Sequence, residues 1–271
     1  MTTITEANIR LGMVLAEAEA RQSTISSHRL ESRDLIPSTI EAAMAVQAIA
    51  VGTIGKEVAG WKLGFNNGRP VAAPLLDVYD ELQDSMLTVP KPGALGIEIE
   101  ICFVLAEDLP ALPLGEAYTR EKILNAVSSV HLGAELVSYR LTEENGAPFP
   151  LFLADRLGNH SFVTGPAIDP SVVDAFAKQD SGLPPLIVEA EDDVLFAAVP
   201  SHPQTDPLAP LVAYANAPND HLGGLKRGHV VTTGSLCGMI RLEGTTRIIA
   251  RWETIGSMDI QLADRVSVMI P

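Results

Sequence analysis

The sequence is short of positive charge and of aromatic side chains. It has 19 lysine and arginine residues against 34 aspartate and glutamate residues, a formal net charge of −15, and 5% aromatic residues. Nucleic acids and anionic lipids carry the same sign of charge, so we expect neither as a partner. An anionic substrate is also repelled at long range, and its site would need a local positive centre such as a metal ion or a lysine.

Other features of common protein classes are missing as well. The two cysteines, Cys102 and Cys237, lie in apolar strand-like sequence, which does not indicate a disulfide framework. No run of about 18 apolar residues occurs, and the N-terminus has no basic region followed by an apolar stretch. Gly223-Gly224-Leu225-Lys226 lacks the spacing of a phosphate-binding loop. These absences predict a soluble, cytoplasmic protein without a nucleotide-phosphate loop.

The apolar content, 46% of 271 residues, is enough for one large core. Apolar residues at helical spacing predict helices over residues 5–21 and 38–54, so residues 1–55 form a predicted helical arm. Residues 56–271 contain many short β-type runs with few helices, which favours an α+β fold with a mixed, strongly curved β core. The predicted strands are Val58–Phe65, Ile97–Leu105, His131–Leu141, Ser161–Thr164, Leu186–Ala190, Val194–Val199, His229–Thr233, Arg247–Glu253 and Ser257–Leu262, with helices at Thr119–Val127 and Leu208–Ala217.

The run Ile97-Glu98-Ile99-Glu100-Ile101 places two carboxylates two residues apart in a strand. Side chains alternate between the faces of a strand, so Glu98 and Glu100 share one face and the isoleucines fill the other. Like charges side by side cost energy unless a cation or solvent compensates, and a hard ion such as Mg²⁺ prefers oxygen ligands. The pattern is also typical of an ordinary solvated strand face whose carboxylates pair with basic residues of a neighbour.

Two further charges stand in apolar surroundings. Glu135, within Leu132 to Tyr139, could complete a carboxylate triad for an octahedral Mg²⁺ or Mn²⁺, or could be a salt-bridged strand residue. Lys62 stands in the glycine-flanked run Ala59 to Phe65, where desolvation would lower its pKa toward usefulness in proton transfer. The alternative for Lys62 is a side chain whose ammonium reaches water.

Taken together, five motifs resemble, in order, the 2-keto-4-pentenoate hydratase branch of the fumarylacetoacetate hydrolase superfamily. The resemblance covers residues 40–262, and the order of the motifs is more specific than any one of them. The motifs are Gly60-Trp61-Lys62-Leu63-Gly64; Ile97 to Leu105; Ala134-Glu135-Leu136-Val137; Leu153-Ala154-Asp155 with Gly158-Asn159 and Phe162-Val163-Thr164-Gly165; and Gly228 to Leu236.

The resemblance implies a β-roll core of the fumarylacetoacetate hydrolase type, a homo-oligomer, and Mg²⁺ or Mn²⁺ held by Glu98, Glu100 and Glu135. It implies a lyase of aromatic hydrocarbon catabolism that hydrates a short 2-hydroxy-2,4-dienoate, a small anionic acid. The alternatives are a 2-oxo acid decarboxylase of the 4-oxalocrotonate type or a C–C hydrolase. Matching positions imply roles for two catalytic residues, Lys62 and Asp155, and for three substrate-binding residues, namely Thr233, Gly234 and Ser235.

Several segments depart from the family's pattern. Residues 65–70 and the loop Leu141 to Pro150 differ from relatives, so the substrate could be another 2-oxo acid. Three extra cations, Arg69, Arg140 and Arg156, are expected in salt bridges, although one could pair a distal carboxylate. His28 and Glu31 have the H-x-x-E spacing of the water-activating pair of the hydrolases, but they lie in the predicted helical arm. His202 is expected to have a structural role in a loop. A binding protein without turnover is the non-enzymatic alternative.

Overall fold

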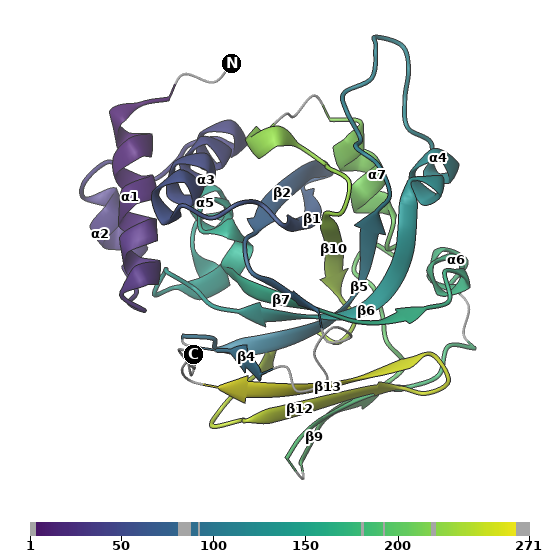
Figure 1. Cartoon of the computed structure of the whole chain (residues 1–271). Helices are drawn as coiled ribbons and strands as arrows, with labels where there is room; N and C mark the ends of the chain where they lie inside the picture. The colour runs from purple at the N-terminus through teal and green to yellow at the C-terminus, as the bar shows by residue number, and fades with distance from the viewer. Residues whose placement is uncertain are drawn as a thin grey trace, which may run out of the picture.

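The computed structural model describes residues 4–80, 88–91, 93–179, 182–191, 193–217 and 221–263. Seven helices and thirteen strands lie in these ranges (Figure 1). The helices are α1 (Glu6–Ala20), α2 (Ser27–Glu31), α3 (Ile40–Ile54), α4 (Arg120–Asn125), α5 (Phe149–Ala154), α6 (Ser171–Ala177) and α7 (Ala209–Ala215). The strands are β1 (Gly60–Asn66), β2 (Arg69–Leu75), β3 (Val78–Asp80), β4 (Thr88–Pro90), β5 (Gly96–Leu105), β6 (Val127–Val137), β7 (Asn159–Ile168), β8 (Leu186–Ala190), β9 (Asp193–Ala198), β10 (Val230–Ser235), β11 (Ile240–Arg241), β12 (Arg247–Trp252) and β13 (Gly256–Ala263).

Two sheets form the β core. The larger has the order β2-β1-β10-β5-β6-β7-β3, with β11 added beside β5, and mixes parallel with antiparallel pairs. It curls so that β5, β6 and β7 lie across the top of the second sheet, which has the order β4-β13-β12-β8-β9 (Figure 1). The predicted α+β fold with a mixed, curved β core is confirmed.

The helices before β1 pack on one side of the larger sheet. Thr39 caps α3 by accepting from the backbone N–H of Ala42, and Gly55 ends it with a positive φ of 75°. In α1, Gly12 permits close approach to α3, because a Cβ there would lie 2.5 Å from Ile49 Cγ2. Apolar residues of α1 and α3 share a core with α5 and β2. The division of the chain into an arm and a catalytic domain at residue 55 stays a prediction.

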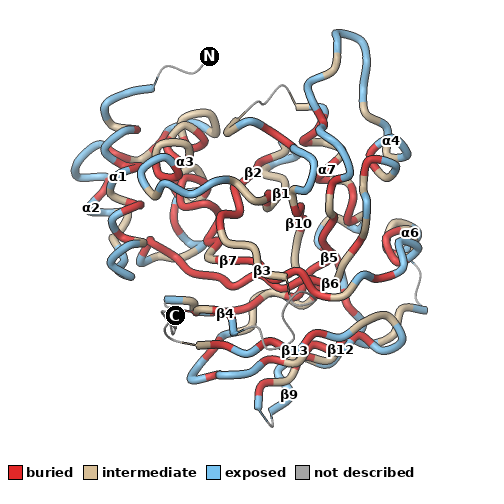
Figure 2. Tube along the Cα trace, in the orientation of Figure 1, coloured by how far each residue is buried: buried red, intermediate tan, exposed pale blue. Residues whose placement is uncertain are grey.

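The main core lies between the two sheets. Ile97, Ile99 and Ile101 of β5 are completely buried and pack with residues of β12 and β13, including Trp252 and Met258. Figure 2 shows this burial in red along most of β5 and β7 and along the later part of β6, whose first residues are intermediate or exposed. The core therefore takes the apolar face of β5 and leaves its glutamates to the opposite face.

Most predicted elements are present within a few residues, and the exceptions have physical reasons. The predicted strand from His131 to Leu141 ends at Val137, and the loop predicted from Leu141 to Pro150 runs into α5. The sequence does not predict β2 because it contains Pro70 and Pro74. These prolines are tolerated because β2 forms the edge of the larger sheet, where missing N–H donors cost no ladder hydrogen bond.

Candidate metal centre

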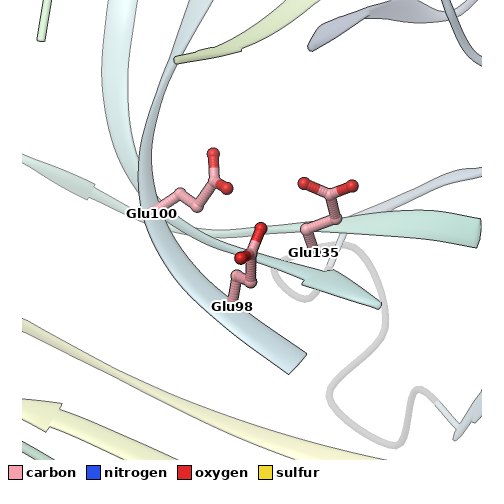
Figure 3. Close-up of side chains that lie close together, drawn as sticks. All are labelled: Glu98, Glu100 and Glu135. Atoms are coloured by element: carbon pink, nitrogen blue, oxygen red, sulfur yellow. The ribbon is translucent and has the colours of Figure 1, made fainter. Parts of the chain in front are cut away.

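Three glutamates converge on one face of the larger sheet. Strand β5 presents Glu98 and Glu100, and the register of β5 with β6 places Glu135 directly opposite Glu98. Opposite residues of an antiparallel pair project from the same face, so the third carboxylate joins the first two. One oxygen of each carboxylate lies within 4.8 Å of the others. Figure 3 shows the three side chains gathered in one place, Glu98 and Glu100 from β5 and Glu135 from β6. The structure thus brings all three predicted metal ligands together.

Lys62 lies against this triad. It comes from β1, and its Nζ donates to Glu135 Oε1 at 3.0 Å and to Glu98 Oε2 at 3.4 Å. Burial alone would lower the pKa of Lys62, but the charges of the neighbouring glutamates outweigh burial and raise the pKa. The expected lowering is therefore wrong for the protein without a metal ion, because the apolar sequence around Lys62 does not reveal the carboxylates that the fold brings beside it.

The triad is buried more deeply than an ordinary set of surface carboxylates. Glu100 and Glu135 are 0% exposed, and Glu98 is half-buried. Burial and the neighbouring carboxylates raise the pKa of Glu100, while Lys62 and the backbone N–H of Gly234 act in the opposite direction. Burial is also the largest cause of the raised pKa of Glu135. Negative charge is thus costly here unless a cation lies against it.

Hydrogen bonds fix one oxygen of Glu100 and leave the other without a partner. Thr232 Oγ1 and the backbone N–H of Gly234, at 3.3 Å, both donate to Oε2. Oε1 is buried and has no hydrogen-bond partner among the described residues. A buried, unpaired carboxylate oxygen on a residue whose carboxylate clusters with two others is suited to coordinate a cation.

A buried polar network holds Glu135 in place. Asn159 Nδ2 donates to Glu135 Oε1 at 3.2 Å, and Arg140 Nη1 donates to the backbone carbonyl of Asn159 at 2.9 Å. Arg140 also forms a salt bridge with Asp155, which is buried. Burial raises the pKa of Asp155, and Arg140 partly offsets this effect. The contacts place Asp155 behind the triad, where it orients Arg140 and, through it, Asn159.

Of the three predicted substrate-binding residues of β10, Gly234 hydrogen-bonds to the triad, whereas the hydroxyls of Thr233 and Ser235 donate to backbone carbonyls. Gly234 contacts Glu100 through its backbone, and its φ of 140° and the nearby ring of Pro203 leave no room for a Cβ. The hydroxyl of Thr233 donates to the carbonyl of Pro207 at 2.7 Å, and that of Ser235 donates to the carbonyl of Gly238 at 3.0 Å. The structure does not bring the Thr233 hydroxyl to the triad, and substrate binding by these three residues stays a prediction.

Two residues that contact the triad, Thr232 and Asn159, were not predicted to do so from the sequence. Strand alternation gives the signal for Thr232, since its register with Lys62 puts the two residues on one face of the sheet. Asn159 is part of a quoted motif, but its contact depends on the pairing of β6 with β7, which no spacing in the sequence reveals. Both contact the triad directly through their side chains.

The remaining candidate residues lie in other surroundings. The three extra arginines pair with carboxylates: Arg69 with Glu41, Arg140 with Asp155, and Arg156 with Glu19. His28 lies 3.9 Å from Glu31, and both side chains are strongly exposed. His202 accepts from the backbone N–H of Gln204 and contacts the Thr233 hydroxyl, as expected of a loop residue.

Solved structures with a similar fold include metal complexes of an enzyme. This chain is similar to 4-oxalocrotonate decarboxylase from Pseudomonas putida G7 complexed with magnesium and adipate, with a TM-score of 0.69 and 19% identity; the match covers 97% of this chain and 100% of that chain. The complex of the decarboxylase from the same organism with calcium and acetate gives a TM-score of 0.68 and 20% identity over the same shares. A yeast protein of the fumarylacetoacetate hydrolase family gives a TM-score of 0.50 and 13% identity over 76% of this chain and 92% of that chain.

At these identities the likeness shows a shared fold. The predicted fold of the fumarylacetoacetate hydrolase type is therefore confirmed, and the resemblance to the hydratase branch stays a prediction. No protein-family model and no curated protein matches the sequence. Among the described residues, no helix is both long and apolar enough to span a membrane.

Proposed function

We propose that this chain is a divalent-metal-dependent enzyme whose Mg²⁺ or Mn²⁺ is held by Glu98, Glu100 and Glu135. The convergence of these buried carboxylates carries the proposal. Among the described residues, Lys62 is the positively charged residue that contacts the triad, through Glu98 and Glu135. One ammonium against three carboxylates leaves two negative charges uncompensated. A divalent ion supplies that charge, and the unpaired oxygen of Glu100 supplies a ligand.

The proposed substrate is a short 2-hydroxy-2,4-dienoate that reacts through its 2-oxo tautomer. Negative charge develops on the 2-oxygen during this chemistry, and a bound divalent ion supplies a positive centre that stabilises it. Lys62 lies beside the triad, so it can donate a hydrogen bond to the substrate carboxylate or move a proton at the reacting end. Asn159 keeps the carboxylate of Glu135 oriented.

Hydration is the reaction that the sequence resemblance implies, and decarboxylation is the second candidate. A specific observation supports the second: a similar fold over the full length of 4-oxalocrotonate decarboxylase, whose structure contains magnesium and adipate. Both reactions need the same stabilisation of charge at the 2-oxygen. A C–C hydrolase is less well supported, because the His28–Glu31 pair is exposed on α2 rather than placed beside the triad. The homo-oligomer and the cytoplasmic location stay predictions.

Product analysis tests the proposal. The Mg²⁺-loaded chain is incubated with 2-hydroxypenta-2,4-dienoate and with 2-oxo-3-hexenedioate, the 2-oxo tautomer of 2-hydroxyhexa-2,4-dienedioate. A 4-hydroxy-2-oxo acid product from either substrate supports hydration, and carbon dioxide release from 2-oxo-3-hexenedioate supports decarboxylation. Neither product from either substrate, in a protein that binds Mg²⁺, would reject these substrates and would mean that residues 65–70 and the loop Leu141 to Pro150 select a different 2-oxo acid.

A further inference from the structure

Strand β11 extends the face of the sheet that carries the triad. Its register with β5 places Ile240 opposite Ile97 and Arg241 opposite Gly96. Gly96 precedes Glu98 by two residues, so Arg241 belongs to the face of Glu98, about 7 Å further along the strand. Ile240 contacts the main core instead. The pairing therefore places Arg241 on the same face of the sheet as the triad, at the start of β5.

Arg241 is held at this position by the loop after β6. Its Nη2 lies 2.5 Å from Glu144 Oε2, and the two side chains are 48% and 29% exposed. Glu144 belongs to the segment Leu141 to Pro150, one of the two in which this chain departs from the family pattern that it resembles. Glu143, the neighbour of Glu144, accepts from the backbone N–H of Ser27, which ties the loop to α2.

Tyr139 lies near the Arg241–Glu144 pair and near Lys62 and Glu98. Its side chain is buried, and its hydroxyl donates to Met239 Sδ at 3.7 Å, two residues before Arg241. Burial raises the pKa of Tyr139, and the charges of Lys62 and Arg241 both act to lower it. The Tyr139 hydroxyl thus lies within electrostatic reach of Arg241 and of Lys62, which contacts the triad.

Two other arginines near the site are buried in salt bridges and cannot reach a second negative group of a ligand. Arg140 and Arg156 are buried and paired with Asp155 and Glu19. Two described arginines that reach solvent, Arg69 and Arg241, lie on the triad face by strand register. Arg69 is on the edge strand β2, opposite Asn66, whereas Arg241 pairs with β5 itself, two residues from Glu98, and is the nearer of the two along the sheet. The guanidinium offers a planar fork of donors that matches a carboxylate.

We propose that Arg241 binds the distal carboxylate of a dicarboxylic 2-oxo acid whose 2-oxo end lies at the triad, an inference that rests on the proposed function. An extended six-carbon diacid together with the arginine side chain is long enough to span the separation along the strand. The carboxylate of Glu144 competes with the ligand for Arg241. The substrate class is then a dicarboxylate such as a 2-hydroxyhexa-2,4-dienedioate rather than a five-carbon monocarboxylate.

Calorimetric titration of the Mg²⁺-loaded full chain with two matched ligands tests this inference. 2-Oxoadipate and 2-oxohexanoate share the 2-oxo acid group and differ in the distal carboxylate. The wild type should prefer 2-oxoadipate, and Arg241→Gln should weaken its binding about five- to tenfold, as expected for one partly exposed charge-assisted contact. Binding of 2-oxohexanoate should stay the same. Glu144→Gln should strengthen the binding of 2-oxoadipate, because it removes the competing charge.

The control is Arg251→Gln, an arginine of β12 that is 52% exposed and pairs with Glu189 in the second sheet. This variant should behave as the wild type. Equal affinity of the wild type for both ligands, no binding of either, or the same result for Arg241→Gln and Arg251→Gln would make Arg241–Glu144 a surface salt bridge and overturn the inference. Failure of the proposed function is seen separately, as absent Mg²⁺ binding in a titration without a 2-oxo acid, and it would overturn this inference too.

Discussion

Replacing Lys62 by Met should destabilise the protein strongly, but only without a divalent ion. The substitution keeps much of the side-chain stem and removes the ammonium that contacts Glu98 and Glu135. Lys62 and Glu135 form a buried pair, with side chains 16% and 0% exposed. Removing one partner of such a pair costs about 3–5 kcal/mol, because it leaves a buried charge uncompensated. For a chain of this size that loss corresponds to a fall in Tm of roughly 6–10 °C.

The loss should depend on pH. The pKa of Glu135 is already raised in the folded protein by burial, and Lys62 acts to lower it, so removing the ammonium raises it further. A carboxylate with a raised folded pKa contributes stability that is present below its unfolded pKa and is lost as pH rises through the folded value. The stability of the variant should therefore be closest to that of the wild type near pH 4, and the difference between the two should be largest at pH 8.

The assay is thermal unfolding by circular dichroism in EDTA and in saturating Mg²⁺, at both pH values. Mg²⁺ should restore most of the stability of the variant at pH 8, since it supplies the missing positive charge. The matched control is Lys56→Met, which removes an exposed ammonium paired with Asp77 and should cost about 0–1 kcal/mol. If Lys62→Met in EDTA at pH 8 is as stable as the control, the buried charge balance described here is wrong.

Two other substitutions test the surroundings of the site. Asp155→Asn should lower the free energy of unfolding in urea by about 3–5 kcal/mol, because it leaves the Arg140 guanidinium buried without its charge partner; a loss below about 1 kcal/mol would contradict this. Burial lowers the pKa of His202 from 6.5 to about 4, so the stability it contributes is present above pH 6.5 and is lost as pH falls through 4. His202→Gln should reduce the loss of stability between these pH values by about 3 kcal/mol. A reduction no larger than that of the exposed-site control His28→Gln would contradict this.

Local patterns in the sequence predict one half of the candidate site. Glu98 and Glu100 could be placed on one face from strand alternation, because that rule needs only neighbouring residues. The position of Glu135 depends on the register of β5 with β6, which the sequence does not show; its apolar surroundings made it a candidate ligand, and the family resemblance supported that choice. The pKa of Lys62 was predicted in the wrong direction for a related reason: an apolar run reveals burial, but not charges that arrive from other strands.

The curved β core could be predicted because many short β-type runs follow one another along the chain. The strands at the edges of the larger sheet could not be predicted. Strand β2 contains two prolines and is identified only by its place at a sheet edge. The contacts of β10 show a similar limit. The register between Thr232 and Ser235 is irregular, and the contact of Thr232 with Glu100 was not predicted. Bulges of this kind depend on the neighbouring strand rather than on local sequence.

Calorimetric titration of the metal-free chain with Mg²⁺ tests the central claim most directly. The account predicts one Mg²⁺ per chain, and a fall in affinity of more than about tenfold in Glu100→Gln, which keeps the shape of the side chain but removes a charged ligand. The control Glu253→Gln, at an exposed position after β12, should bind as the wild type does. No Mg²⁺ binding by the wild type, or an unchanged affinity in Glu100→Gln, would contradict the assignment of the triad as a metal centre.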